Sequence, residues 1–358
     1  MKRILCVDDE VQVLESLRDL LRPYRRTFAV EFAVGGEEGL RKIATGAAYD
    51  VVLSDVRMPG VDGVTFLTCV MEQLPGAARI VLSGQTDEAT ALRAAGVAHQ
   101  FLIKPCEGPQ LASTIERACV IHDVVGDERI RNLVAGAGTL PSAPAAFAAL
   151  RALADDPDAC IDDAATIVER DVAMCAKVLQ LVNSAFFGLG RRVASARDAV
   201  VYLGMDTVRS LVIVVETFGQ FGATSIPGFC VAELEAHSLA VAAAASDLGA
   251  DATEKTDAWL VGMLHDVGLL FLADRDPDGV TAVMDSVAAG ASEEAAEKAA
   301  FGATHARIGA YLLGLWGLPD NVVEAVAALG DGAENGNRLV DILRRAHANA
   351  PHMEVAVL

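Results

Sequence analysis

Ile4-Leu5-Cys6-Val7-Asp8-Asp9-Glu10, near the start of the chain, joins a continuous apolar run directly to three acids. A run without polar alternation is typical of a strand that is buried on both faces of a parallel sheet. Four further short apolar runs follow, and segments with helical spacing lie between or after them. This order predicts an α/β domain with a five-stranded, doubly wound parallel sheet. The predicted strands contain Ile4–Val7, Ala29–Val34, Val51–Leu53, Ile80–Leu82 and Phe101–Ile103.

The composition excludes several classes of protein. The chain has 358 residues, with 49 Asp and Glu against 29 Lys and Arg, and a formal net charge of −20. Such a balance disfavours general nucleic-acid binding, which needs cations against the phosphates. No apolar stretch reaches the roughly 18 residues of a membrane span, and the first residues do not resemble an export signal. We therefore expect a cytoplasmic protein that binds neither nucleic acid nor a membrane.

Polar side chains follow four of the predicted strands. Asp8 and Asp9 follow the first, Asp55 the third, Ser83 the fourth and Lys104 the fifth. Because the carboxyl ends of parallel strands meet at one edge of a sheet, these side chains are expected to converge. Crowded carboxylates repel one another unless a divalent cation lies among them, and an oxygen-only pocket suits Mg²⁺. With that cation in place, one carboxylate can accept a phosphoryl group.

Four separated motifs within residues 1–122 resemble the receiver domain of bacterial response regulators. They are Val7-Asp8-Asp9-Glu10, Ser54-Asp55-Val56-Arg57-Met58-Pro59-Gly60-Val61-Asp62-Gly63, Leu82-Ser83-Gly84 and Phe101-Leu102-Ile103-Lys104-Pro105. The resemblance implies a flavodoxin-like fold, Mg²⁺ as cofactor and phosphorylation by a sensor histidine kinase. It also implies a cis bond between Lys104 and Pro105. The roles it implies are Asp55 as phosphoacceptor, Asp8, Asp9, Asp55 and the backbone carbonyl of Arg57 as metal ligands, Ser83 and Lys104 as phosphoryl sensors, and Phe101 as the aromatic that turns inward.

The strand signal ends near residue 123, and helical patterns dominate beyond it. Residues 123–138 are interpreted as a linker or helical extension, because Gly and Pro punctuate the sequence from 136 to 144. Residues 139–330 are expected to form an all-α domain, in which one helix runs from Thr256 to Leu272. Residues 331–358 are expected to be a loop followed by a helical tail.

Histidines in the all-α segment suggest a second site. His237, His265, Asp266 and His305 could project from separate helices into one bundle and hold a metal ion. The adjacent His265 and Asp266 need polar partners if they are buried in an apolar helix. The remaining histidines have no metal-binding spacing and are expected at the surface or in loops: His99, His122, His347 and His352.

The His265-Asp266 pair resembles the HD superfamily of metal-dependent phosphohydrolases. The surrounding sequence resembles its mostly non-catalytic relative, the HDOD domain, at Leu140–Pro144, Val178–Gly188 and Ala199–Gly204. Two departures count against hydrolysis, because Leu269 stands where the hydrolase pattern has lysine, and Ala327-Ala328 lies where a His pair often follows. We therefore interpret the HD residues as a polar cluster that is satisfied by hydrogen bonds, and we assign no metal to this domain. A weakly held ion without turnover and an active hydrolase remain the alternatives.

The two resemblances together predict a two-component response regulator. Phosphorylation of Asp55 would control the HDOD segment as a signalling or interaction module, with a downstream partner that the sequence does not identify. The alternative is a phosphorylation-controlled, metal-dependent phosphohydrolase that uses the four HD residues. A DNA-binding regulator is disfavoured by the acidic balance. Homodimerisation is compatible with the resemblance but does not follow from the sequence.

Overall fold

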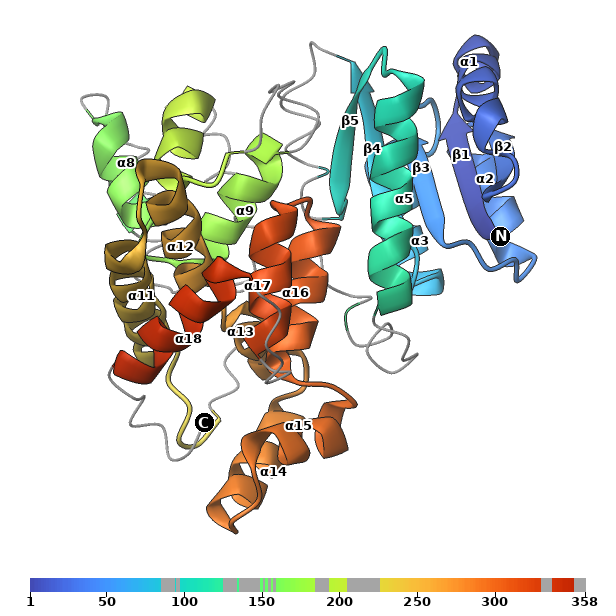
Figure 1. Cartoon of the computed structure of the whole chain (residues 1–358). Helices are drawn as coiled ribbons and strands as arrows, with labels where there is room; N and C mark the ends of the chain where they lie inside the picture. Colours follow the sequence, from blue (N-terminus) through green and yellow to red (C-terminus); the bar gives the residue numbers. More distant parts are fainter. Residues whose placement is uncertain are drawn as a thin grey trace. The chain divides into compact units, whose positions relative to one another are not determined.

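The chain folds into two compact units, an α/β unit and a helical unit (Figure 1). The structure is a computed structural model. It describes residues 1–84, 97–124, 159–183, 193–204, 226–329 and 337–350, together with the isolated positions 94, 134, 149, 150, 152, 153 and 156. Predictions for the remaining residues lie outside this description, among them the linker after residue 124 and the motif Leu140–Pro144.

The α/β unit contains the predicted five-stranded parallel sheet, in the order β2-β1-β3-β4-β5. The fold class predicted from the sequence is therefore confirmed for this unit. Its strands are apolar along their length because helices cover both faces, with α1 against α5 and α2 against α3. The strands are β1 (Lys2–Asp8), β2 (Phe28–Val34), β3 (Val51–Asp55), β4 (Ala78–Gly84) and β5 (Gln100–Lys104). The helices are α1 (Val11–Leu21), the short η1 (Arg22–Tyr24), α2 (Gly36–Ala44), α3 (Gly63–Gln73) and α5 (Gly108–Val124).

His99 lies in a loop, one of the two locations expected for it, but it is buried and not at the surface. It lies just before β5 and is 3% exposed. Its Nδ1 accepts the backbone N–H of Arg79 at 3.0 Å, and its Nε2 lies 2.8 Å from the Arg79 guanidinium. Arg79, which is itself fully buried, also donates to the carbonyl of Val97. The imidazole is therefore a packing element of the sheet, whose Nδ1 satisfies the buried backbone N–H of Arg79.

The helical unit is built around the antiparallel pair α11 and α12. Helix α18 packs against both of them, and α17 packs against α12 and α18. The all-α class predicted for this half of the chain is confirmed. The helices are α8 (Ile161–Val168), α9 (Val172–Asn183), a helical stretch over 196–204, α11 (Val231–Leu248), α12 (Ala252–Leu264), α13 (Val267–Arg275), α14 (Pro277–Ala288), α15 (Glu293–Phe301), α16 (His305–Leu315), α17 (Asp320–Leu329) and α18 (Arg338–Asn349).

The single helix predicted from Thr256 to Leu272 is wrong. Two helices, α12 and α13, meet there at His265 and Asp266, which form a turn. Asp266 has φ −99° and ψ 12°, outside the helical range. The apolar spacing continues through both helices, so periodicity alone could not reveal the break.

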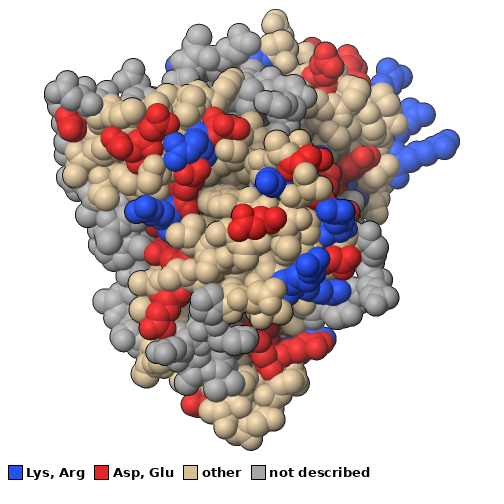
Figure 2. Space-filling view, turned by 60° about the vertical axis from the view of Figure 1, so that its left-hand side comes forward, with Lys and Arg blue, Asp and Glu red and all other residues tan. Residues whose placement is uncertain are grey.

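The stretch Ala252–Arg275, which includes this turn, is long and apolar enough to cross a membrane by length and composition. It is mostly buried within the helical unit, as a core helix would be. On the face in Figure 2, Lys and Arg side chains lie in small groups that alternate with Asp and Glu. The described residues on that face therefore form no continuous basic strip.

Candidate functional site

The carboxylates of the α/β unit meet because the strands that carry them are neighbours. Asp8 ends β1 and Asp55 ends β3, and the register of these parallel strands sets Val7 beside Ser54. Lys104 ends β5 and reaches back across the edge of the sheet. Its Nζ lies 2.5 Å from Asp8 Oδ2 and also pairs with Asp55 Oδ1. Three strand ends therefore bring two acids and one ammonium to one point.

The second oxygen of each acid is held by the backbone. Asp8 Oδ1 accepts the N–H of Glu10 at 2.9 Å, and Asp55 Oδ2 accepts the N–H of Arg57 at 2.7 Å. These bonds fix the carboxylate planes, so that the other oxygens point at Lys104. The loop after each strand thus orients the acid that ends the strand.

Burial and charge act in opposite directions at this cluster. Burial raises the pKa of Asp55 above its ordinary value, and the neighbouring Asp8 adds to the rise, while Lys104 opposes it. Burial would lower the pKa of Lys104, but its contacts with Asp55 and Asp8 outweigh burial and raise that pKa. The ammonium therefore stays charged beside two carboxylates.

The donor set fits a hard divalent cation. Asp8 is fully buried, Asp55 is 9% exposed and Asp9, directly after β1, is partly exposed. The three carboxylates carry more negative charge than the ammonium of Lys104 can neutralise. A divalent cation would therefore relieve the repulsion between them. Oxygen-rich sites of this kind suit Mg²⁺. The residues that would hold Mg²⁺ are Asp8, Asp9 and Asp55, with the carbonyl of Arg57 as the further ligand implied by the resemblance.

The other receiver residues line the neighbouring strands. Ser83 on β4 is buried and lies beside Ile103 on β5. Phe101 on β5 lies beside Val81 and is only 2% exposed, so its ring is already packed inside. The bond between Lys104 and Pro105 is cis, which confirms the prediction for that bond.

In the helical unit, two glycines let the site helices approach closely. A Cβ on Gly262 of α12 would lie 2.6 Å from Ala242 Cα of α11. A Cβ on Gly268 of α13 would lie 2.0 Å from the carbonyl oxygen of His305, at the start of α16. Since no side chain fits at either crossing, the backbones can approach closely there. This packing brings His237 of α11 and His305 to the turn between α12 and α13.

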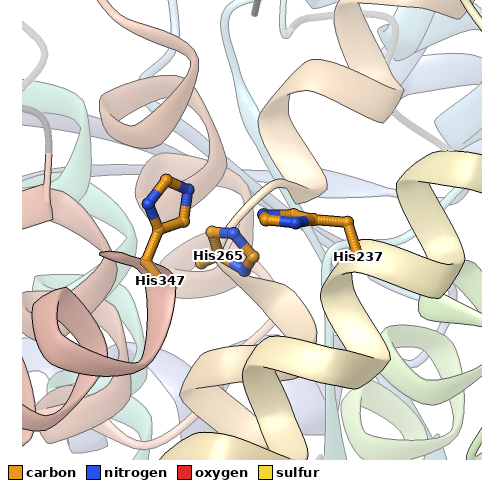
Figure 3. Close-up of side chains that lie close together, drawn as sticks. All are labelled: His237, His265 and His347. Atoms are coloured by element: carbon orange, nitrogen blue, oxygen red, sulfur yellow. The ribbon is translucent and has the colours of Figure 1, made fainter. Parts of the chain in front are cut away.

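Three histidines converge at this turn (Figure 3). His237 comes from α11, His265 from the turn and His347 from α18, and their ring centroids lie 5.2–5.3 Å apart. One ring nitrogen from each lies within 4.8 Å of the others. Asp266 adds an oxygen, with Oδ2 at 3.1 Å from His265 Nε2 and 3.8 Å from His237 Nε2. The site is therefore a cluster of three imidazoles beside one carboxylate.

His347 corrects the sequence analysis, which expected it at the surface or in a loop. It lies near the end of α18, one helical turn after the buried Leu343. Leu339, Leu343 and His347 recur at intervals of four residues and so share one face of the helix. This spacing was the signal that the histidine faces the bundle.

His305 contacts the opposite side of Asp266. Its Nε2 lies 3.4 Å from Asp266 Oδ1, and its Nδ1 lies 2.6 Å from Glu297 Oε1. Its backbone N–H donates to the other oxygen of Glu297 at 3.0 Å. Glu293 lies farther off, 3.6 Å from the same ring nitrogen. The four predicted residues are thus brought together around Asp266, but His305 lies against acids rather than among the other histidines.

Charges in this cluster shift the pKa values of its members. Burial would lower the pKa of His305, but Glu297 and Asp266 outweigh it and raise that pKa well above the ordinary value. Burial would raise the pKa of Asp266, but His265 and His305 lower it well below the ordinary value. Burial, reinforced by His265, lowers the pKa of His347 to about 4. His347 is therefore neutral near pH 7, and Asp266 is ionised.

The two departures from the hydrolase pattern are apolar positions in the structure. Leu269 lies within α13 and is 3% exposed, so no cation projects from that position. Ala327 and Ala328 lie in α17, and Ala328 is buried. Their side chains offer no ligand atoms.

Comparison with protein families agrees with this division of the chain. A response regulator receiver domain matches residues 4–116, and an HDOD domain matches residues 140–331, more than half of the chain. The chain therefore belongs to the HDOD domain family, and with a receiver domain ahead of its HDOD domain it has the architecture of a response regulator.

Particular relatives match parts of the chain. The hydrogenase transcriptional regulatory protein HoxA of Bradyrhizobium diazoefficiens is 36% identical over 122 residues, 33% of this chain and 24% of HoxA. A protein-glutamate methylesterase/protein-glutamine glutaminase of Geobacter sulfurreducens is 32% identical over 164 residues, 42% of this chain and 44% of that protein. The chain thus spans less than half the length of these curated relatives. The crystal structure of the MmoQ response regulator from Methylococcus capsulatus str. Bath matches with a TM-score of 0.50 and 27% identity, over 59% of this chain and 85% of that chain.

Proposed function

We propose that this response regulator accepts a phosphoryl group on Asp55 from a sensor histidine kinase and thereby controls its HDOD module. The observation that carries the proposal is the convergence of Asp8, Asp55 and Lys104 at three strand ends. When bound, Mg²⁺ at Asp8, Asp9, Asp55 and the Arg57 carbonyl supplies positive charge that offsets the negative charge of a phosphoryl group.

The protein's own residues supply the rest of the switch. Asp55 offers Oδ1 as the nucleophile, since Oδ2 is engaged by the N–H of Arg57. In this structure Lys104 forms ion pairs with both Asp8 and Asp55. After the phosphoryl group is transferred to Asp55, Lys104 pairs with the phosphoryl oxygens. The hydroxyl of Ser83 moves to the same group. Phe101, whose side chain is buried, would follow Ser83 and turn further inward, and phosphorylation would favour the states in which it has done so.

The HDOD module acts by binding a downstream partner rather than by turnover. This part of the proposal rests on Leu269, which leaves the cluster without the cation that would contact a phosphate, and on the alanines at 327 and 328. The protein would work in the cytoplasm and without nucleic acid or membrane as partner. Pairing of two copies is compatible with this role.

Phosphorylation is tested by labelling the full chain with a small-molecule phosphodonor in the presence of Mg²⁺. We expect about one acid-stable but base-labile phosphoryl group per chain in the wild type and none in Asp55→Asn. The matched control is Asp19→Asn, an exposed aspartate on α1, which should label as the wild type does. Equal labelling of Asp55→Asn and the wild type would show that another residue is the acceptor.

A metal-dependent phosphohydrolase is the second candidate, because His237, His265 and Asp266 converge as metal ligands would. A chromogenic phosphodiester distinguishes the two functions. We expect the wild type, supplied with Mn²⁺, Fe²⁺ or Zn²⁺, to hydrolyse it no faster than His265→Ala does. Hydrolysis by the wild type that His265→Ala abolishes would establish the enzyme instead.

A further inference from the structure

We propose that a cluster of exposed arginines at the end of α1 is a docking surface for an acidic segment of a partner protein. This arginine cluster consists of Arg18, Arg22, Arg25 and Arg26. Helix α1 begins beside the acids that follow β1 and runs about 16 Å away from them over its 11 residues. The cluster therefore lies away from the phosphoryl site, and the inference does not depend on phosphorylation of Asp55.

The spacing of the arginines places three of them in one row. Arg18 and Arg22 are four residues apart, about 6 Å along a helix, so they share one face of α1 and its continuation. Arg22 and Arg25 are three residues apart across η1. Side chains at that spacing in a 3₁₀ turn lie one above the other, again about 6 Å apart. The row therefore presents guanidinium groups at intervals of roughly one helical turn, and Arg26 follows it directly.

The charges of the arginine cluster are not neutralised within the chain. None of its guanidinium groups has an ion pair or a side-chain hydrogen bond with a described residue. Glu31, on the adjacent strand β2, already pairs with Arg3 and Lys42. Cations in the last turn of a helix are favoured by the helix dipole, but Arg25 and Arg26 lie beyond the end of α1. The dipole therefore does not account for the cluster.

Ring packing anchors the turn that carries the arginines. Pro23 lies at the start of η1, where its ring fixes the backbone φ angle. Tyr24 stacks on Phe28 with ring centroids 6.0 Å apart, and the guanidinium of Arg18 lies 4.8 Å from the ring centroid of Phe32. A surface that is ordered before binding loses less conformational entropy when a partner docks. The arginine cluster is thus prearranged for binding.

The chemistry of the guanidinium group selects carboxylates as the partner groups. Its planar fork can donate two parallel hydrogen bonds to one carboxylate. Arginine is also enriched at protein interfaces, where lysine is depleted, and every cation of the cluster is an arginine. An acidic helix carries carboxylates three or four residues apart, with about 5–6 Å between their Cβ atoms. That interval matches the row, so the partner segment is expected to be an acidic helix.

The charge of the whole chain favours a short acidic segment over a long polyanion. The formal net charge is −20, and the row of arginines is only about 12 Å long. A DNA duplex or an anionic membrane extends beyond the row and would face acids elsewhere on the surface, which repel it. A second copy of the chain would bring the same net charge and be repelled as well. A protein segment can present its carboxylates to the arginines alone.

The experiment uses fluorescently labelled poly-L-glutamate as the probe and measures its binding to the full chain by anisotropy. We expect saturable binding at low salt that weakens steeply as salt is added, because exposed ion pairs are screened. Asp55→Asn should bind the probe as the wild type does, which separates this result from any failure of phosphorylation. No saturable binding at low salt would overturn the proposal.

Paired charge reversals locate the surface. Arg22→Glu combined with Arg25→Glu should weaken binding about tenfold or more, since each exposed ion pair contributes a few-fold and the reversal adds repulsion. Arg307→Glu combined with Arg345→Glu is the matched control, because both arginines are exposed in the helical unit and the change in net charge is the same. This control should bind nearly as the wild type does. Equal losses in the two pairs would show that net charge alone governs binding and would overturn the proposal.

Further probes test the class of partner. A DNA duplex and phosphatidylglycerol vesicles should bind more weakly than poly-L-glutamate at the same salt concentration. Tighter binding of either one through the same arginines would overturn the proposal, as would a salt-sensitive dimer of the wild type that the charge reversals dissolve. Arg22→Lys combined with Arg25→Lys keeps the charge but should lose part of the affinity, because lysine cannot donate the paired hydrogen bonds. Unchanged affinity in this variant would contradict the proposed pairing with carboxylates.

Discussion

Lys104 and His265 show how single residues determine the chemistry of the two sites. Lys104 stays charged because two acids outweigh the effect of burial on its pKa. His265 directs Nε2 toward Asp266 because the carbonyl of Gly262 holds Nδ1. In both cases the neighbouring groups set the protonation state or the orientation of the side chain that faces the site.

Lys177 on α9 gives a prediction of pH dependence. Burial lowers its pKa from 10.5 to about 7. The unfolded chain therefore binds more protons than the folded chain between these values, and the free energy of unfolding rises as the pH increases from 7 to 10.5. The slope from this group is about 1.4 kcal/mol per pH unit. Lys177→Met removes this contribution.

Denaturant unfolding of both proteins at pH 7, 8 and 9 measures the effect. The free energy of unfolding of Lys177→Met minus that of the wild type should fall by about 1 kcal/mol from pH 7 to 8 and by about 1.3 kcal/mol from pH 8 to 9, because the folded lysine is still partly protonated near its pKa of about 7. A constant difference over this range would mean that the folded lysine titrates with its ordinary pKa. Comparing the two proteins at each pH cancels the contributions of all other groups.

The helical elements meet where glycines remove the side chain from the contact. Gly262 lies at the crossing of α12 with α11, and Gly268 at the crossing of α13 with the start of α16. The apolar side chains of these helices form the core of the unit. The glycines let the helix backbones approach closely, and the distances between His237, Asp266 and His305 depend on that approach. Element packing therefore determines the site geometry more than the local sequence around each ligand does.

Gly268→Ala tests this dependence. Its Cβ would lie 2.0 Å from the carbonyl oxygen of His305, a backbone atom that can yield only if the helix moves. We expect a loss of about 2–3 kcal/mol in the free energy of unfolding, as is typical of overpacking. Gly108→Ala is the control, because its Cβ would meet the nearest atom at an ordinary 3.5 Å. Equal stability of the two variants in chemical denaturation would contradict the close crossing.

The whole molecule comprises two units, each with its own core and its own cluster of ionisable side chains. In the α/β unit the donors are carboxylates, which suit a hard ion, and in the helical unit they are mainly imidazoles, which suit a transition metal. The two clusters therefore differ in the chemistry of their donor atoms.

Calorimetry of the full chain tests this separation. Mg²⁺ held by the carboxylates of the α/β unit would stabilise that unit, so it should raise the temperature of one unfolding transition and leave the other in place. Asp8→Asn should abolish the shift with Mg²⁺. A single transition that moves as a whole with Mg²⁺ would show that the units unfold as one.

Much of the fold could be predicted because burial leaves a local pattern. The continuous apolar runs identified all five strands, and the residues that end them were correctly expected to converge, as Asp8, Asp55 and Lys104 do. The turn at His265 and Asp266 could not be found in this way, since the apolar spacing continues from α12 into α13. The role of His347 was missed because its partners are distant in sequence and no short motif contains it.

The sequence alone was enough to predict the five strands and the acids at their ends, because buried strands leave a short-range apolar pattern and parallel strands end at one edge of the sheet. Only the tertiary structure decided which imidazoles share a centre, since that depends on how closely three helical elements cross and on which nitrogen each hydrogen bond occupies. His347 and Asp266 meet through packing, and no spacing along the chain records that distance.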